Sequence, residues 1–71
     1  MKTIAKWESR NGHHAVELVD YEDGAYGYSG RGCGGCLGVM TREAAIARIE
    51  SMVVQGYFLP DAAKRPMRRT L

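Results

Sequence analysis

Two cysteines and two histidines are the classical zinc ligands of this 71-residue chain, and the cysteines could also react as thiols. Cys33 and Cys36 form a C-x-x-C pair in a glycine-rich stretch, and His13 and His14 are adjacent earlier in the chain. Tetrahedral zinc takes four such ligands, and C-x-x-C is a common half of a zinc site. Adjacent residues of a strand point to opposite faces, so both histidines cannot reach one ion without distortion. We therefore expect no metal and no cofactor, and keep a zinc-stabilised protein only as an alternative.

Other chemistry of the cysteines is also disfavoured. A redox-active C-x-x-C pair normally lies at a helix N-terminus, where the helix dipole stabilises the thiolate. The predicted helix starts only around Arg42, too far along the chain for this effect. Nucleophilic catalysis by a cysteine with a histidine would need a pocket that a chain of this length hardly forms. The sequence therefore predicts a protein that is not an enzyme, with its cysteines in tight turns.

The glycine-rich stretch also contains the spacing of a dinucleotide-binding loop. Gly30, Gly32 and Gly35 match G-x-G-x-x-G, and Glu50 lies near the position of the acidic residue in such sites. That site needs a strand, the glycine turn and then a helix in direct succession. Residues 36–40 intervene before the predicted helix, and no second strand follows it to complete the unit. The spacing therefore argues against nucleotide binding.

The hydrophobic pattern predicts strands and one helix. Thr41 is a good N-cap, Glu43 suits the first turn, and Gly56 suits the helix end. Asn11-Gly12 and the turn at residues 22–24 predict tight connections between strands. Strands are expected over residues 3–8, 14–19, 25–29 and 36–40, and the helix face expected to pack on the sheet consists of Ala45, Ile46, Ile49, Met52, Val53 and Gly56.

These elements predict a small α+β domain: an antiparallel meander sheet of three to four strands packed by one helix. The domain is expected over residues 1–59, followed by a basic, extended or partly disordered tail over residues 60–71. Glycine weakens a strand unless a neighbour packs closely against it. We therefore expect Trp7 or the helix to fill the space beside Gly27.

Charge is distributed unevenly along the chain. Residues 1–30 carry three basic and five acidic side chains, and residues 31–71 carry seven basic and three acidic ones. Dedicated nucleic-acid binders usually have a larger basic excess. No apolar run reaches the length that spans a bilayer, and no signal-peptide pattern opens the chain. We expect a cytoplasmic protein without a membrane partner.

Binding to another protein is the function that these features favour. Aromatic residues and arginine are enriched at interface hot spots, and one helix leaves the second face of a sheet uncovered. We expect that face to bind a partner or a second copy of the chain. The predicted contact residues are Trp7, Tyr26, Tyr28, Arg31, Arg65, Arg68 and Arg69.

In size and style the chain resembles small bacteriophage-encoded accessory and inhibitor proteins, including the anti-CRISPR proteins. The resemblance lies in a hairpin start (KWESRNGHHAVELVD), one helix (TREAAIARIESMVVQG) and no enzymatic motif. It implies a protein that binds and modulates a larger complex in a bacterial host cell by covering its surface. Many such inhibitors mimic the charge of DNA, whereas this chain has a net charge of +2. The alternative is a nucleic-acid-binding accessory protein.

Overall fold

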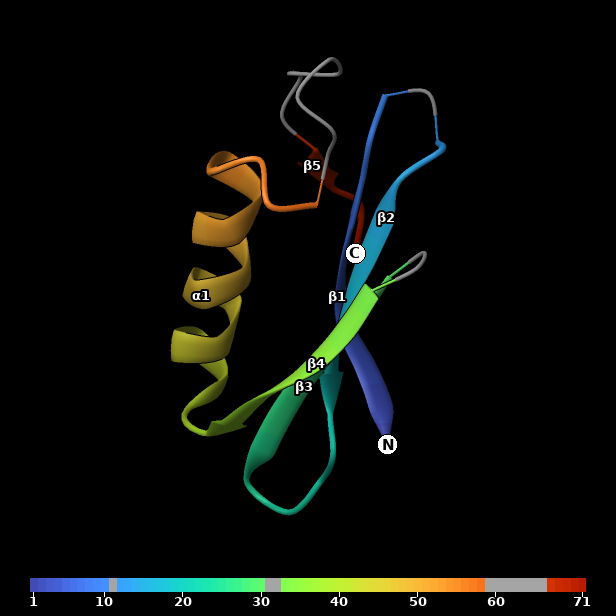
Figure 1. Ribbon diagram of the computed structural model, residues 1–71. Helices are drawn as coiled ribbons and strands as arrows, with labels where there is room; N and C mark the ends of the chain where they lie inside the picture. The colour runs from blue at the N-terminus through green and yellow to red at the C-terminus, as the bar shows by residue number, and fades with distance from the viewer. Residues whose placement is uncertain (11, 31–32, 59–66) are drawn as a thin grey trace.

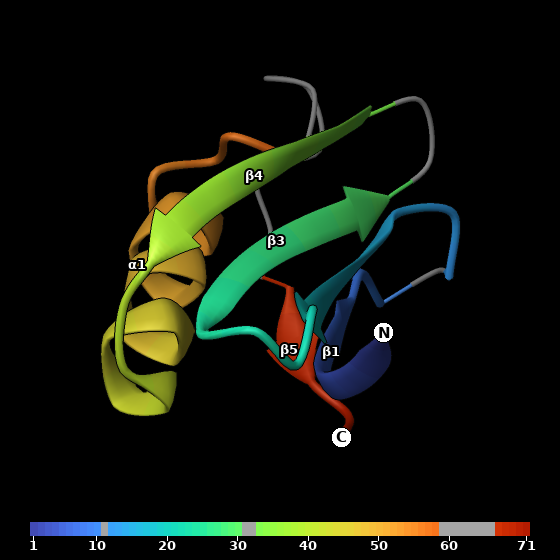
Figure 2. The same ribbon diagram turned by 90° about the horizontal axis from the view of Figure 1, so that it is seen from below.

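A computed structural model describes residues 1–10, 12–30, 33–58 and 67–71. The elements are β1 (Lys2–Glu8), β2 (Ala15–Asp20), β3 (Ala25–Gly30), β4 (Cys33–Val39), α1 (Arg42–Val54) and β5 (Arg68–Arg69). The five strands form one antiparallel sheet in the order β4-β3-β2-β1-β5, and α1 covers one of its faces (Figure 1, Figure 2). The predicted α+β class is confirmed, with one strand more than expected.

The first hairpin closes between Ser9 and His14. The Ser9 N–H donates to the His14 carbonyl oxygen at 2.8 Å, and the His14 N–H donates to Ser9 Oγ at 3.0 Å. Gly12 has a φ of +74°, a conformation that glycine adopts without steric strain. The hairpin predicted from Asn11-Gly12 is therefore confirmed, although Asn11 itself lies outside the described residues.

The turn between β2 and β3 is closed by two aspartates. Asp20 Oδ1 accepts a hydrogen bond from the Glu22 N–H at 2.7 Å, and Asp23 Oδ1 accepts one from the Ala25 N–H at 3.0 Å. Short side chains that bond to the backbone two residues later are typical of such turns. The turn predicted at residues 22–24 is confirmed.

Strand β4 begins at Cys33, three residues before the predicted start at Cys36. Gly34 pairs with Ser29 and Gly35 pairs with Tyr28, so the glycines continue the ladder instead of reversing the chain. The prediction of a tight turn that contains the cysteines is therefore wrong, whereas the strand expected from Cys36 onward is present. Tertiary pairing outweighs the low strand propensity of glycine here, because β3 supplies a ready partner for every one of these positions.

Helix α1 has the caps that its sequence predicts. Thr41 Oγ1 accepts a hydrogen bond from the Ala44 N–H at 3.2 Å, which satisfies one of the free donors of the first turn. At the other end the Gly56 N–H donates to Val53 O and the Tyr57 N–H donates to Met52 O, the bonds of a Schellman motif. Gly56 has a φ of +77°, which this motif requires. These capping bonds set the length of the helix.

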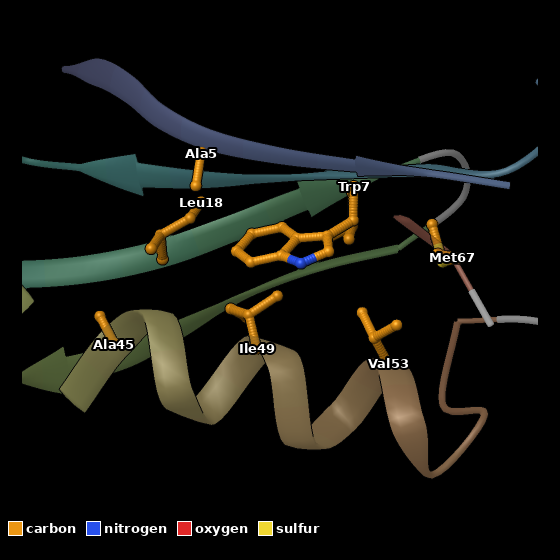
Figure 3. Close-up of a cluster of buried hydrophobic side chains, with 8 residues drawn as sticks. Ala5, Trp7, Leu18, Ala45, Ile49, Val53 and Met67 are labelled. Carbon is orange, nitrogen blue, oxygen red and sulfur yellow. The ribbon is translucent and has the colours of Figure 1, made fainter. Parts of the chain in front are cut away.

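The core lies between α1 and the sheet (Figure 3). Trp7 extends from β1 toward the helix and is only 2% exposed. Each fully buried aliphatic side chain contributes about 1.5–3 kcal/mol of hydrophobic stabilisation. The buried cluster consists of Ala5, Trp7, Val16, Leu18, Ala45, Ile49, Val53 and Met67, and Ile46, Met52 and Phe58 pack against it. The predicted helix face is confirmed except for Gly56, which belongs to the C-cap.

The last residues of the chain join this fold. Met67 is 5% exposed and lies in the core, and Arg68 and Arg69 pair with Glu8 and Trp7. The Thr70 N–H extends the pairing with a 2.8 Å bond to Lys6 O. The boundary predicted at residue 59 therefore needs correction, because residues 67–71 belong to the domain. Residues 60–66 of the predicted tail lie outside the described part.

Among the described residues, no helix has both the length and the apolar character needed to cross a membrane.

Candidate binding surfaces

Trp7 does not lie on an exposed face, contrary to the prediction. Its side chain is 2% exposed and stands in the core between β1 and α1 (Figure 3). Trp7 pairs with Val16 across β1 and β2, and neighbouring partners of an antiparallel pair point to the same face. The indole therefore shares the apolar face of the sheet, which is the face that the helix covers. Trp7 is a core residue in this fold.

Tyr26 and Tyr28 lie on the same covered face. Tyr28 pairs with the buried Leu18, and both tyrosines are half-buried against the core. The Tyr28 ring contacts Phe58 edge to face, with ring centroids 5.6 Å apart. The prediction that these tyrosines occupy the face left free by the helix is wrong, because the register places them beside the core.

The opposite face of the sheet is largely polar. Lys6 pairs with Glu17, and its Nζ lies 4.0 Å from Glu8 Oε1. Thr3 Oγ1 donates to Glu17 Oε1 at 3.2 Å. Such alternation of apolar and polar faces is usual for an antiparallel sheet covered on one side. Trp7, Tyr26 and Tyr28, which we expected on this face, therefore lie on the other one; the aromatic ring that packs here is that of Tyr21, over Gly27.

Of the predicted arginines, the structure describes two. Arg31 and Arg65 lie outside the described residues, whereas Arg68 and Arg69 are exposed on β5. The Arg69 guanidinium lies 5.8 Å from the centroid of the Trp7 ring, within the range of a cation–π contact. Its Nε donates to Leu71 O at 2.8 Å. These two contacts hold Arg69 at one side of the sheet.

Arg69 borders an open pocket between the start of β1, the first turns of α1 and the end of the chain. The pocket has a volume of about 260 Å³. Three of its side chains are cationic, and the others are apolar apart from one threonine. We call it the basic pocket; its lining residues are Lys2, Thr3, Ile4, Arg42, Ile46, Arg69 and Leu71.

Among the described residues, no acidic side chain lines the basic pocket. Asp20 pairs with Lys2 in the sheet, but its Oδ1 accepts the Glu22 N–H and it does not line the pocket. Arg42 is the first residue of α1, where the helix dipole adds partial positive charge. Lys2, Arg42 and Arg69 bring three cationic side chains to the pocket, although Arg69 Nε already bonds to Leu71 O at 2.8 Å. Such a cluster of cations attracts anionic groups.

The basic pocket combines this charge with apolar surface. Ile4 and Ile46 are half-buried and belong to the same lining as the three cationic residues. Arginine binds carboxylates and phosphates through a planar fork of donors, and lysine binds them as a point charge. The arrangement suits an anionic group that adjoins an apolar one.

Cys33 and Cys36 both belong to β4. In the backbone register, position 33 pairs with Gly30 and position 36 pairs with Gly27. Cys36 is exposed, and its Sγ lies 3.8 Å from Tyr26 O. Within the described ranges, no three residues of the metal-ligating types gather at one point.

Sequence reasoning missed Lys2 and Arg42 as members of a site. They are 40 positions apart in the chain, and neither belongs to a local motif. Only the packing of α1 beside the start of β1 brings them to one pocket. The sequence did predict Arg69 as a contact residue, and Arg69 lies on the border of the basic pocket.

Comparison with known proteins found no matching family model, no matching curated protein and no matching solved structure.

Proposed function

We propose that this chain is a small non-enzymatic binding protein that modulates a larger protein or nucleoprotein complex by covering part of its surface. The observation that supports the proposal is the basic pocket, which Lys2, Arg42 and Arg69 line and which has no acidic side chain from the described part of the chain in its lining. An acidic side chain of the partner enters this pocket and an adjacent apolar side chain contacts Ile4 and Ile46. The resemblance to phage inhibitors makes a bacterial defence complex the first partner to test.

Charge complementarity of this kind acts mainly on specificity and association rate. A rim charge exposed to solvent contributes little to affinity, whereas a fully desolvated charge pair contributes much more. The apolar part of the pocket matters for that reason, because Ile4 and Ile46 help to exclude water around the bound anion.

The test uses the protein as bait in bacterial lysate, with captured proteins identified by mass spectrometry. Arg42→Glu reverses one charge in the pocket and favours folding, because an acidic residue suits the first turn of a helix. Arg48→Glu is the matched control, since Arg48 is exposed on the same helix and does not line the pocket. We expect a partner retained by the wild type and by Arg48→Glu, and lost with Arg42→Glu.

The affinity for the identified partner is then measured with purified components. Reversal of the charge at Arg42 should weaken binding at least about tenfold, equivalent to about 1.4 kcal/mol. Equal affinities of Arg42→Glu and Arg48→Glu would contradict the role of the pocket.

A second candidate function is nucleic-acid binding, which the same three cations favour. Phosphate contacts make affinity fall steeply with salt, with a slope of about −0.9 per neutralised phosphate on duplex DNA. Three contacts would therefore give a slope near −2.7. The protein-binding proposal expects no binding to labelled DNA or RNA at physiological salt. Tight binding with that slope, abolished by Arg42→Glu, would favour nucleic acid instead.

A further inference from the structure

The two edges of the sheet differ in how they are protected against pairing with another chain. β5 forms one edge and consists of only two residues, Arg68 and Arg69, both charged. β4 forms the other edge, and its seven residues, CGGCLGV, carry no charge and no proline. Short strands and charged side chains are the usual means by which natural sheets prevent edge pairing. One edge of this sheet has both protections, and the other has neither.

The first part of β4 is regular enough to accept a new strand. Its ladder with β3 is continuous from Gly30↔Cys33 to Gly27↔Cys36, and a register shift follows that leaves Leu37 without a partner. Within the described residues, no strand pairs with the outer edge of β4. Gly34 and Gly35 have no side chains there to keep a neighbouring backbone away.

We propose that this edge pairs with the same edge of a second copy of the chain, so that two five-stranded sheets join antiparallel through residues 33–36. A two-fold interface places the same segment opposite itself. Like charges directly opposite each other destabilise a pair of strands, and this segment contains none. A second copy therefore meets no electrostatic penalty along the shared edge.

The size of the chain gives a physical reason for such pairing. A domain of about 60–70 residues buries a smaller fraction of its surface than a larger one and is correspondingly marginal in stability. Pairing through β4 satisfies backbone groups that no described strand bonds, and adds contacts without a larger core. The basic pocket lies beside β1 and β5, at the other end of the strand order. The dimer therefore leaves that pocket accessible and is independent of the proposed function.

The test begins with the oligomeric state of the full chain, measured by sedimentation equilibrium over a range of concentrations. We expect a monomer–dimer equilibrium for the wild type. Gly34→Lys should raise the dissociation constant at least about tenfold, because pairing about residues 33–36 places the two lysines opposite or diagonal to each other. Among the described residues, a Cβ at Gly34 meets only Tyr28 O, at 3.5 Å, so the fold accommodates the side chain.

Ser29→Lys is the matched control. Ser29 is exposed and lies directly opposite Gly34 in the β3–β4 pair, so its lysine has the same charge on the same face, one strand further from the edge. This variant should dimerise like the wild type. Cys36→Lys, at another exposed position of the edge, should act like Gly34→Lys.

Charge complementation provides the sharpest comparison. Gly34→Glu should also be monomeric, and mixing it with Gly34→Lys should restore a dimer that contains one chain of each. A wild type that stays monomeric at every concentration would overturn the proposal. That result is expected if the edge binds a strand of another protein and not a second copy of this chain. A dimer that both Gly34→Lys and Cys36→Lys leave intact, or a mixture that forms no mixed dimer, would overturn it as well.

Discussion

The ring of Tyr21 lies over Gly27, on the face of the sheet opposite α1. A Cβ atom at Gly27 would lie 2.8 Å from Tyr21 Cζ and 2.8 Å from the main-chain oxygen of Gly35. We had expected Trp7 or the helix to fill the space beside Gly27, but the Tyr21 ring occupies it instead. An aromatic ring packed on a strand glycine restores contacts that the missing side chain does not provide. Gly27 and Tyr21 therefore act as one packing unit.

Substitution of Gly27 should consequently destabilise the fold. Gly27→Ala introduces a methyl group where both a ring and a backbone oxygen stand too close, and overpacking of this kind costs about 1–3 kcal/mol. The measurement is the free energy of unfolding from urea denaturation. Gly34→Ala is the control, since the one described atom that its Cβ would meet is Tyr28 O, at 3.5 Å. Equal stability of the two variants would show that Tyr21 does not pack on Gly27.

Loss of the Tyr28 ring should affect folding first. Tyr28 is half-buried and contacts Phe58, so Tyr28→Ala removes both core surface and an aromatic pair. We expect a loss of about 2 kcal/mol, below the 3–5 kcal/mol of a fully buried aromatic residue. Tyr57→Ala, at a ring that also contacts Phe58 but is 63% exposed, should cost clearly less. A stable Tyr28→Ala protein would place this tyrosine on a binding surface after all.

The C-terminal strand should contribute measurably to stability. Met67 is almost completely buried, so Met67→Ala should cost about 2 kcal/mol or more through lost burial and the remaining cavity. Arg68→Ala, at the exposed neighbouring position, should change stability by less than about 0.5 kcal/mol. Thermal unfolding followed by circular dichroism compares the two. A neutral Met67→Ala variant would mean that residues 67–71 do not hold their place in the sheet.

The thiols should be dispensable for folding. The double variant Cys33→Ser and Cys36→Ser should keep the melting temperature of the wild type within a few degrees, because β4 pairs through its backbone and Cys36 is exposed. Metal analysis of the purified wild type should find well below one zinc per chain. Collapse of the double variant, together with stoichiometric zinc, would establish the alternative of a zinc-stabilised protein.

The local pattern of the sequence determined most of the elements. Thr41 and Gly56 marked the helix because capping depends on hydrogen bonds to nearby backbone groups, which a residue makes with its own neighbours. Asn11-Gly12 and the aspartate-rich turn marked the first two connections for the same reason. Helical periodicity identified the buried face, because the spacing of side chains on a helix does not depend on what packs against it.

Only the tertiary structure decided which face of each strand is buried and which distant residues meet. Alternation shows that Tyr26 and Tyr28 share a face, but the register with Leu18 decides that this face is the covered one. The fifth strand could not be predicted, because two arginines have no strand pattern of their own and pair only where β1 offers an edge. The basic pocket depends likewise on the packing of α1 against β1, which brings together side chains from opposite ends of the sequence.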